Sequence, residues 1–226
     1  MAQPTVDQRV RLNYIQWKEE FKAEKPYEVI SEIPEGNKRR NFSLEAGPEE
    51  VIQDMRGSHL TQTPSRATIF HQSEVFFKKL IQEPRFIYLT GVSVDPISIY
   101  AFDARSLFLS LFMQFTMHTI EDFPLAVCDG STVPSEKLLA VDHVRKYHIG
   151  ESLYPLYCET SRWYYLNGQG RDEVLLFKTF DSSTKAAAKC CPHTSFHQQQ
   201  SAPLGHSRET IEVRALVFSR NRMFGD

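Results

Sequence analysis

Short apolar and aromatic runs, separated by turn residues, dominate the second half of the chain. They are rich in Tyr, Phe, Val or Leu and lie at residues 124–129, 154–159, 162–166, 173–179 and 212–218. Turn residues such as Asn167-Gly168 bound them, and helical patterns do not alternate with them. Short strands at this spacing predict a mainly β fold, a barrel or jelly roll with few helices, in preference to a parallel sheet.

The first half of the chain has weaker patterns. Residues 1–48 are polar and interrupted by proline and glycine, so we expect an irregular N-terminal arm lying over a single β domain at 49–226. Helical spacing of apolar residues predicts a helix over 72–82, and Ser135 is a predicted helix cap for residues 135–139. Residues 84–120 are apolar and aromatic without a clear period, so we regard them as an atypical segment.

Composition narrows the classes of partner. With 226 residues and 41% hydrophobic content the chain can bury a substantial core. A net charge of -2 leaves no basic footprint, so we expect no nucleic-acid partner. The apolar stretch at 106–117 is too short to span a bilayer, and the N-terminus has no secretory pattern. Four cysteines without C-x-x-C spacing favour a reduced, cytoplasmic protein. Because the apolar stretch is too short to span a bilayer, we expect no membrane association.

Three residues in the last third of the chain carry candidate chemistry. His193 is followed fifteen positions later by Arg208, and Thr210 opens the next predicted strand. An imidazole can ligate iron, while a guanidinium can hold a carboxylate through two hydrogen bonds and a nearby hydroxyl can share it. The pattern predicts His193 as a metal ligand and Arg208 and Thr210 as the binding site for the far carboxylate of 2-oxoglutarate. The plainer alternatives are a structural histidine and a surface arginine paired with Glu209.

Several ordered blocks carry a resemblance to a known family. The chain closely resembles the fungal asaB-type hydroxylase/desaturase family, which includes the gibberellin desaturase and is related to CmcJ. The matching blocks are Asn13-Tyr14, Arg40-Asn41-Phe42, Asp54-Met55-Arg56-Gly57, 121–129, 162–165, 173–178, 180–182, 192–196 and 208–218.

The resemblance implies a fold and a chemistry. It implies an iron(II) and 2-oxoglutarate dioxygenase on a double-stranded β-helix, so that residues 49–226 would be an oxygenase-like domain. Its substrate would be a small-molecule natural product, hydroxylated or desaturated during fungal secondary-metabolite biosynthesis. In the family pattern His193 matches the distal iron ligand, and Arg208 and Thr210 match the co-substrate clamp.

The chain departs from this pattern at the other two iron ligands. Such iron usually takes a His-x-Asp pair besides the distal histidine, and none of the eight histidines here has Asp or Glu two positions later. The family's motif would fall in the unmatched stretch from about 83 to 120. His71 with Glu74, or His118 with Glu121, are substitutes if each pair shares a helical face. Cys190-Cys191 beside His193 offers a rival zinc, copper or thiolate site.

Three hypotheses remain open at the sequence level. The chain is an active oxidoreductase whose missing ligands come from the replaced segment, or it is a non-catalytic relic or binding protein that keeps the fold and the clamp without iron. In the third hypothesis, a misread exon boundary has removed a His-x-Asp motif that the true protein contains.

Overall fold

A computed structural model describes the chain over most of its length. The described residues are 6–32, 37, 39–57, 62–64, 87–90, 107–171, 173–184, 186–198 and 208–219. The strands are β1 Gln8–Ile15, β2 Tyr27–Val29, β3 Leu44–Asp54, β4 Gln62–Pro64, β5 Ile87–Thr90, β6 Leu107–Thr116, β7 Leu125–Cys128, β8 Leu138–Arg145, β9 His148–Pro155, β10 Trp163–Tyr165, β11 Glu173–Asp181, β12 His193–Ser195 and β13 Thr210–Ser219. The helical elements among the described residues are short 3-10 turns, η1 Glu19–Lys22, η2 Met55–Gly57, η3 Gly130–Thr132 and η4 Ser135–Lys137.

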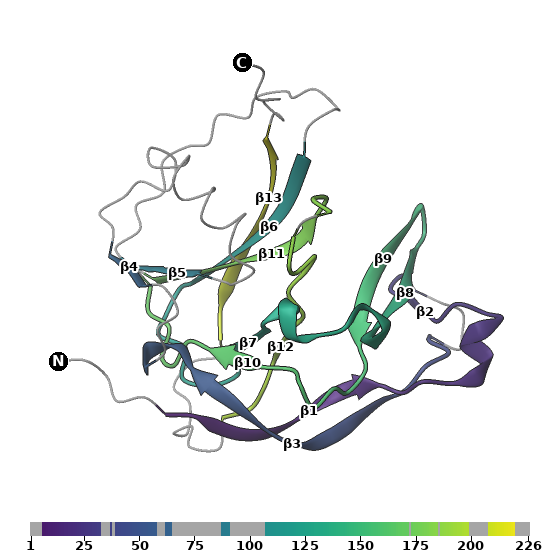
Figure 1. Cartoon of the computed structure of the whole chain (residues 1–226), viewed down its shortest axis with the longest axis horizontal. Coiled ribbons are helices and arrows are strands. Elements are labelled where there is room, and N and C mark those ends of the chain that lie inside the picture. The colour runs from purple at the N-terminus through teal and green to yellow at the C-terminus, as the bar shows by residue number, and fades with distance from the viewer. Residues whose placement is uncertain are drawn as a thin grey trace. The chain divides into compact units, whose positions relative to one another are not determined.

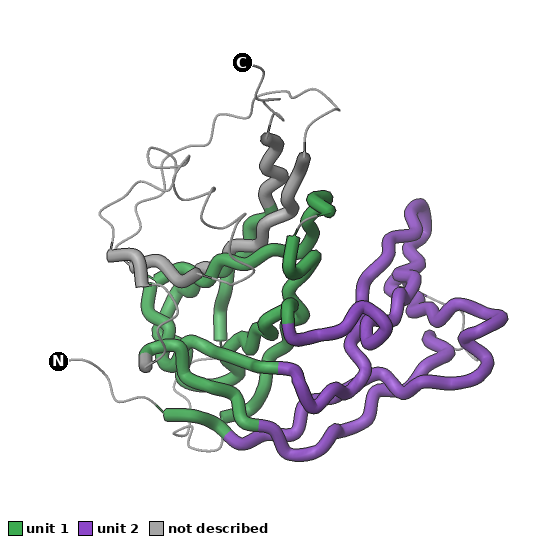
Figure 2. Tube along the Cα trace, in the orientation of Figure 1, with its two compact units in different colours: residues 1–8, 51–131, 162–226 green, residues 9–50, 132–161 purple. Residues whose placement is uncertain are grey.

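The chain divides into two compact units, coloured separately in Figure 2. Unit 1 comprises residues 1–8, 51–131 and 162–226, and unit 2 comprises residues 9–50 and 132–161. Each unit is therefore assembled from segments that are far apart in the sequence.

Unit 1 contains strands of two sheets, and Figure 1 labels them. In the first, β10 pairs in parallel with the end of β3 and antiparallel with β7, and β7 pairs antiparallel with β12. The second sheet has the order β13-β6-β11-β5-β4. The antiparallel pairing of β6 with both β11 and β13 places the atypical segment's strand inside this sheet.

A buried cluster joins the two sheets of unit 1. Leu125 and Val127 of β7 and Tyr164 of β10 pack with Leu175 and Phe177 of β11. Apolar side chains from the inner faces of two sheets thus form one core, as in a jelly roll. The predicted fold class, mainly β with few helices, is confirmed.

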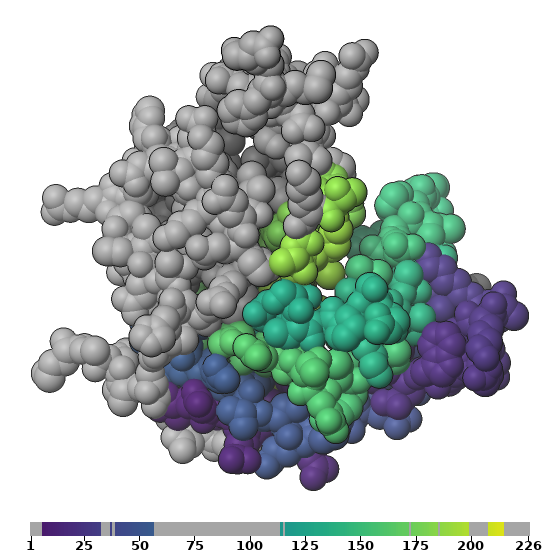
Figure 3. Space-filling model, in the orientation of Figure 1, coloured from purple at the N-terminus to yellow at the C-terminus, as the bar shows by residue number. Residues whose placement is uncertain are grey.

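Unit 2 is built around the three-stranded sheet β2-β8-β9. Its core contains Ile15, Phe42 and Val141, with Tyr154 and other half-buried residues packed against them. Strands β8 and β9 form a hairpin, and Tyr147 in its turn is 88% exposed. In the space-filling view of Figure 3, the hairpin is among the coloured residues, whose placement is described.

The structure corrects two local predictions. Residues 8–15, expected to be irregular, form β1 because Val10, Leu12 and Tyr14 alternate with exposed residues and are buried. The helix predicted at 135–139 is only the single turn η4, after which Leu138 begins strand β8. Where the oxygenase-like domain begins stays a prediction.

Other predictions meet the limits of the described residues. The helix predicted over 72–82 lies outside them. Within the described part of the chain, no helix has the length and apolar character needed to cross a membrane.

Candidate active site

His193 opens β12, opposite Val127 of β7. Its Nδ1 lies 3.0 Å from the carbonyl oxygen of Cys191, and its ring lies 4.7 Å from that of Phe177. When Nδ1 carries the proton and donates to this carbonyl, Nε2 keeps its lone pair. Burial lowers the pKa of His193, although the Cys191 carbonyl and Glu212 act in the opposite direction. The environment therefore favours the neutral imidazole that a metal ligand requires.

Strand β13 brings polar side chains to the face that His193 approaches. Across the intervening strand β6, the register aligns Glu212 of β13 with Leu175 of β11. It aligns Arg214 with Phe177 in the same way. Opposed residues of neighbouring strands point to the same side of a sheet, and Leu175 and Phe177 belong to the core between the sheets. Thr210, Glu212 and Arg214 therefore share the inner face of the roll. The register therefore points the Arg214 side chain inward.

Arg208 lies two residues before β13 and is held by a backbone contact. Its Nη1 donates to the carbonyl oxygen of Phe123 over 2.6 Å. Its Nε is buried and has no hydrogen-bond partner among the described residues. Burial lowers the pKa of Arg208, and the nearby charge of Glu212 opposes that shift. A half-buried guanidinium with an unpaired N–H fits a carboxylate ligand such as the far end of 2-oxoglutarate.

Sequence reasoning missed a second histidine and its carboxylate. Asp122 is buried, and its oxygens lie 2.8 and 3.0 Å from Nδ1 of His197. The same carboxylate accepts the N–H groups of Phe123 and Gln198. Burial raises the pKa of Asp122, but these hydrogen bonds outweigh it and the net shift is downward. The sequence could have indicated Asp122, because it lies just before a buried strand. No local pattern linked it to His197.

The described residues do not complete an iron site. His193 supplies one nitrogen, but among these residues no group of three His, Cys, Asp or Glu side chains could hold a metal ion. Nε2 of His118 lies 4.0 Å from Oε2 of Glu209. The described backbone from 117 to 124 forms no helix that would place His118 and Glu121 on one face. The alternative pair His71 and Glu74 lies outside the described residues.

The adjacent cysteines have the properties of buried thiols. Cys191 Sγ donates to the carbonyl oxygen of Cys128 over 3.1 Å. Burial raises the pKa of Cys190 and raises that of Cys191 well above the usual range for a thiol. The rival thiolate site is therefore disfavoured, because both groups stay protonated at neutral pH.

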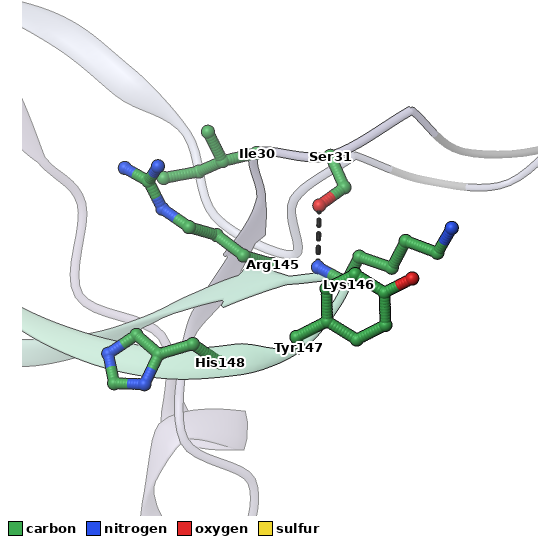
Figure 4. Close-up of a pocket in the computed structure, with 6 residues that line it drawn as sticks. All are labelled: Ile30, Ser31, Arg145, Lys146, Tyr147 and His148. Atoms are coloured by element: carbon green, nitrogen blue, oxygen red, sulfur yellow. Dashed lines mark hydrogen bonds between the residues drawn. The ribbon is translucent and has the colours of Figure 1, made fainter.

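A pocket of about 310 Å³ lies in unit 2, where β2 ends beside the β8–β9 turn (Figure 4). The Ser31 hydroxyl accepts the backbone N–H of Lys146 at this point. The lining residues are Ile30, Ser31, Arg145, Lys146, Tyr147 and His148. None of the residues predicted as a metal or co-substrate site is among them, so the pocket does not contribute to that site.

Comparisons with known proteins find sequence similarity to fungal oxygenases. A family model described as an oxidoreductase/YMDC permease-like domain matches residues 115–218. The aspirochlorine biosynthesis protein N of Aspergillus oryzae is 35% identical over 105 residues, which cover 46% of this chain and 44% of that protein. The Fe(II)/2-oxoglutarate-dependent dioxygenase nvfI of Aspergillus novofumigatus is 35% identical over 127 residues, covering 51% and 44%. The hydroxylase/desaturase asaB of Aspergillus flavus is 30% identical over 109 residues, covering 42% and 48%.

The matched stretches thus span less than half of these relatives. Among solved structures, the iron and alpha-ketoglutarate-dependent endoperoxidase NvfI aligns with a TM-score of 0.65 at 18% identity, covering 95% of this chain and 98% of that one. That likeness establishes the shared fold. The chain is thus similar in sequence to fungal hydroxylase/desaturases and Fe(II)/2-oxoglutarate-dependent dioxygenases, and it shares the jelly-roll fold of NvfI.

Proposed function

We propose that the chain is an oxidoreductase that hydroxylates or desaturates a small-molecule natural product in fungal secondary metabolism, using Fe(II) and 2-oxoglutarate. The names of its relatives support the reaction class. The position of Arg208 supports a role in holding the co-substrate.

The observation that carries this proposal is the unpaired, buried Nε of Arg208. A buried N–H without an acceptor is costly, so a site that keeps one has use for an acceptor from a ligand. Because Nη1 already donates to Phe123, the Nε–Nη2 edge is the one that can form a two-pronged pair with a carboxylate. Thr210 begins β13 two residues later and would add a hydroxyl donor.

His193 would contribute one nitrogen ligand to the metal. Its Nδ1 contact to Cys191 orients the ring, and the Phe177 ring supports one side of it. The remaining ligands must then come from outside the described residues. Glu212 lies within electrostatic range of both His193 and Arg208, so its charge acts on both halves of the proposed site.

An anaerobic titration with iron(II) and 2-oxoglutarate tests the proposal. We expect the weak visible charge-transfer band of the chelated co-substrate to appear, and His193→Ala to abolish it. Arg208→Ala should raise the 2-oxoglutarate concentration needed for the band by roughly tenfold or more, because it removes a charge-assisted pair. Arg145→Ala, an exposed arginine in unit 2, is the matched control and should leave the titration unchanged.

A flat spectrum from a folded chain would contradict the oxidoreductase proposal. It would favour the non-catalytic relic or binding protein that keeps the roll and the clamp without iron. Reading the transcript across the region encoding residues 83–120 then shows whether a His-x-Asp stretch has been omitted, as the exon-boundary hypothesis requires.

A further inference from the structure

The Asp122 carboxylate organises the turn that leads into β7. It accepts the N–H of Phe123 over 2.7 Å, the N–H of Gln198 over 3.0 Å, and Nδ1 of His197 over 2.8 Å. These contacts join the start of β7 to the segment that follows β12. Asp122 is almost fully buried, so its oxygens depend on these donors for compensation.

Phe123 adopts a backbone conformation that is unusual for a bulky residue. Its φ is 50°, in the left-handed region that favours glycine. The Phe123 ring is about half exposed and lies 5.4 Å from the His197 ring. A strained residue persists where its surroundings hold it, and here the Asp122 contacts do so.

The carbonyl of this strained residue is the group that holds Arg208. Nη1 of Arg208 donates to the Phe123 oxygen over 2.6 Å, and the buried Nε has no acceptor in the described part of the chain. A guanidinium is planar, so fixing one nitrogen restricts the direction of the other edge. The Phe123 conformation therefore determines where the remaining Nε–Nη2 edge points.

We propose that Asp122 and Phe123 are positioning residues for the carboxylate clamp. Asp122 locks the left-handed turn, and the Phe123 carbonyl then orients Arg208 so that its Nε–Nη2 edge receives a carboxylate. This inference rests on the proposed function, because it assumes that Arg208 binds the far carboxylate of the co-substrate. His197 supports the turn by binding Asp122 and does not contact the ligand.

Glutarate is a suitable probe because it has the carboxylate spacing of 2-oxoglutarate without the 2-oxo group that chelates metal. Its affinity for the metal-free full chain can be measured by ligand-observed NMR titration. We expect Asp122→Ala to weaken glutarate binding by roughly tenfold, approaching the loss caused by Arg208→Ala. Asp122→Asn keeps an oxygen that accepts both backbone N–H groups and should retain binding within about threefold.

Asp129→Ala is the matched control at the other end of β7. Asp129 is also buried and holds a turn, since it accepts the backbone N–H and the hydroxyl of Ser131. We expect it to lower thermal stability while leaving glutarate affinity unchanged. If Asp122→Ala does not fold, Asp122→Glu replaces it, because the extra methylene displaces the carboxylate and should weaken binding severalfold.

The outcomes separate this inference from the proposed function. If the unaltered chain does not bind glutarate, or if Arg208→Ala binds it equally well, the clamp itself is wrong. If Arg208→Ala weakens binding but Asp122→Ala or its glutamate replacement binds like Asp129→Ala, the clamp stands and the positioning role is overturned.

Discussion

At the scale of single residues, Arg56 shows how one buried ion pair fixes a turn within unit 1. Its Nη1 and Nη2 bind both carboxylate oxygens of Glu173 over 2.9 and 2.6 Å. The same guanidinium donates to the carbonyl oxygens of Asn167 and Gly168. The Arg56 and Glu173 side chains are only 17% and 10% exposed, so each ion depends on the other for its compensation.

Replacing Arg56 by alanine would leave the Glu173 carboxylate buried without its counter-ion. We expect the free energy of unfolding to fall by about 3–5 kcal/mol, measured by urea unfolding followed by tryptophan fluorescence. The control is Arg9→Ala, because Arg9 is 70% exposed and 3.7 Å from Glu49, and such pairs contribute about 0–1 kcal/mol. Equal losses in the two variants would show that the buried pair has no special weight.

At the scale of elements, the segment between Cys190 and β12 passes very close to the end of β7. A Cβ added at Gly130 would lie 1.9 Å from the carbonyl oxygen of Cys190, which is a backbone atom. The N–H of Cys128, at the end of β7, donates to the Pro192 carbonyl over 2.8 Å. The close contact therefore lies next to the pairing of β7 with β12, the strand that His193 begins. The absence of a side chain at Gly130 is what permits it.

Gly130→Ala should therefore displace the segment that leads into β12. We expect a loss of about 1–3 kcal/mol or more in the free energy of unfolding, together with weaker iron-dependent absorbance through His193. Gly150→Ala is the control, because its added Cβ would meet only the His148 ring at 3.5 Å. Its effect should stay within about 1 kcal/mol. A Gly130 variant as stable as the Gly150 variant would mean that the close approach relaxes freely.

The elements also show what the sequence could and could not predict. The apolar runs at 173–179 and 212–218 correspond to β11 Glu173–Asp181 and β13 Thr210–Ser219, because side-chain alternation and turn residues are local signals. The proline and glycine content of residues 1–48 led to the prediction of an irregular arm. The alternation of buried and exposed residues in β1 is nonetheless clear. The contact of Asp122 with His197 joins positions 75 apart, and the φ of Phe123 opposes its own preference. Neither follows from local propensity, since tertiary contacts impose both.

At the scale of the whole chain, the first residues take part in both compact units. In unit 1, the N–H of Val6 donates to Asp54 over 3.1 Å, and Asp7 accepts the N–H of Asp54 over 2.9 Å. The Tyr165 hydroxyl donates to the Val6 carbonyl. In unit 2, the core includes residues contributed by β1 and by the stretch just before β3. Residues before 49 therefore contribute to the core and to the hydrogen bonding of the units, which an irregular arm lying over the domain would not do.

Deleting residues 1–48 tests this directly. The deletion removes Ile15 and Phe42 from the core of unit 2. In unit 1 it removes Val6, which hydrogen-bonds to both Asp54 and Tyr165. Since a large-to-small change at one core position already costs about 2–5 kcal/mol, we expect residues 49–226 to lose cooperative unfolding in urea. Far-ultraviolet circular dichroism and tryptophan fluorescence should then report transitions that no longer coincide. If the shortened chain unfolds in a single transition at the same urea concentration as the full chain, residues 1–48 are dispensable and the arm predicted from the sequence is the better description.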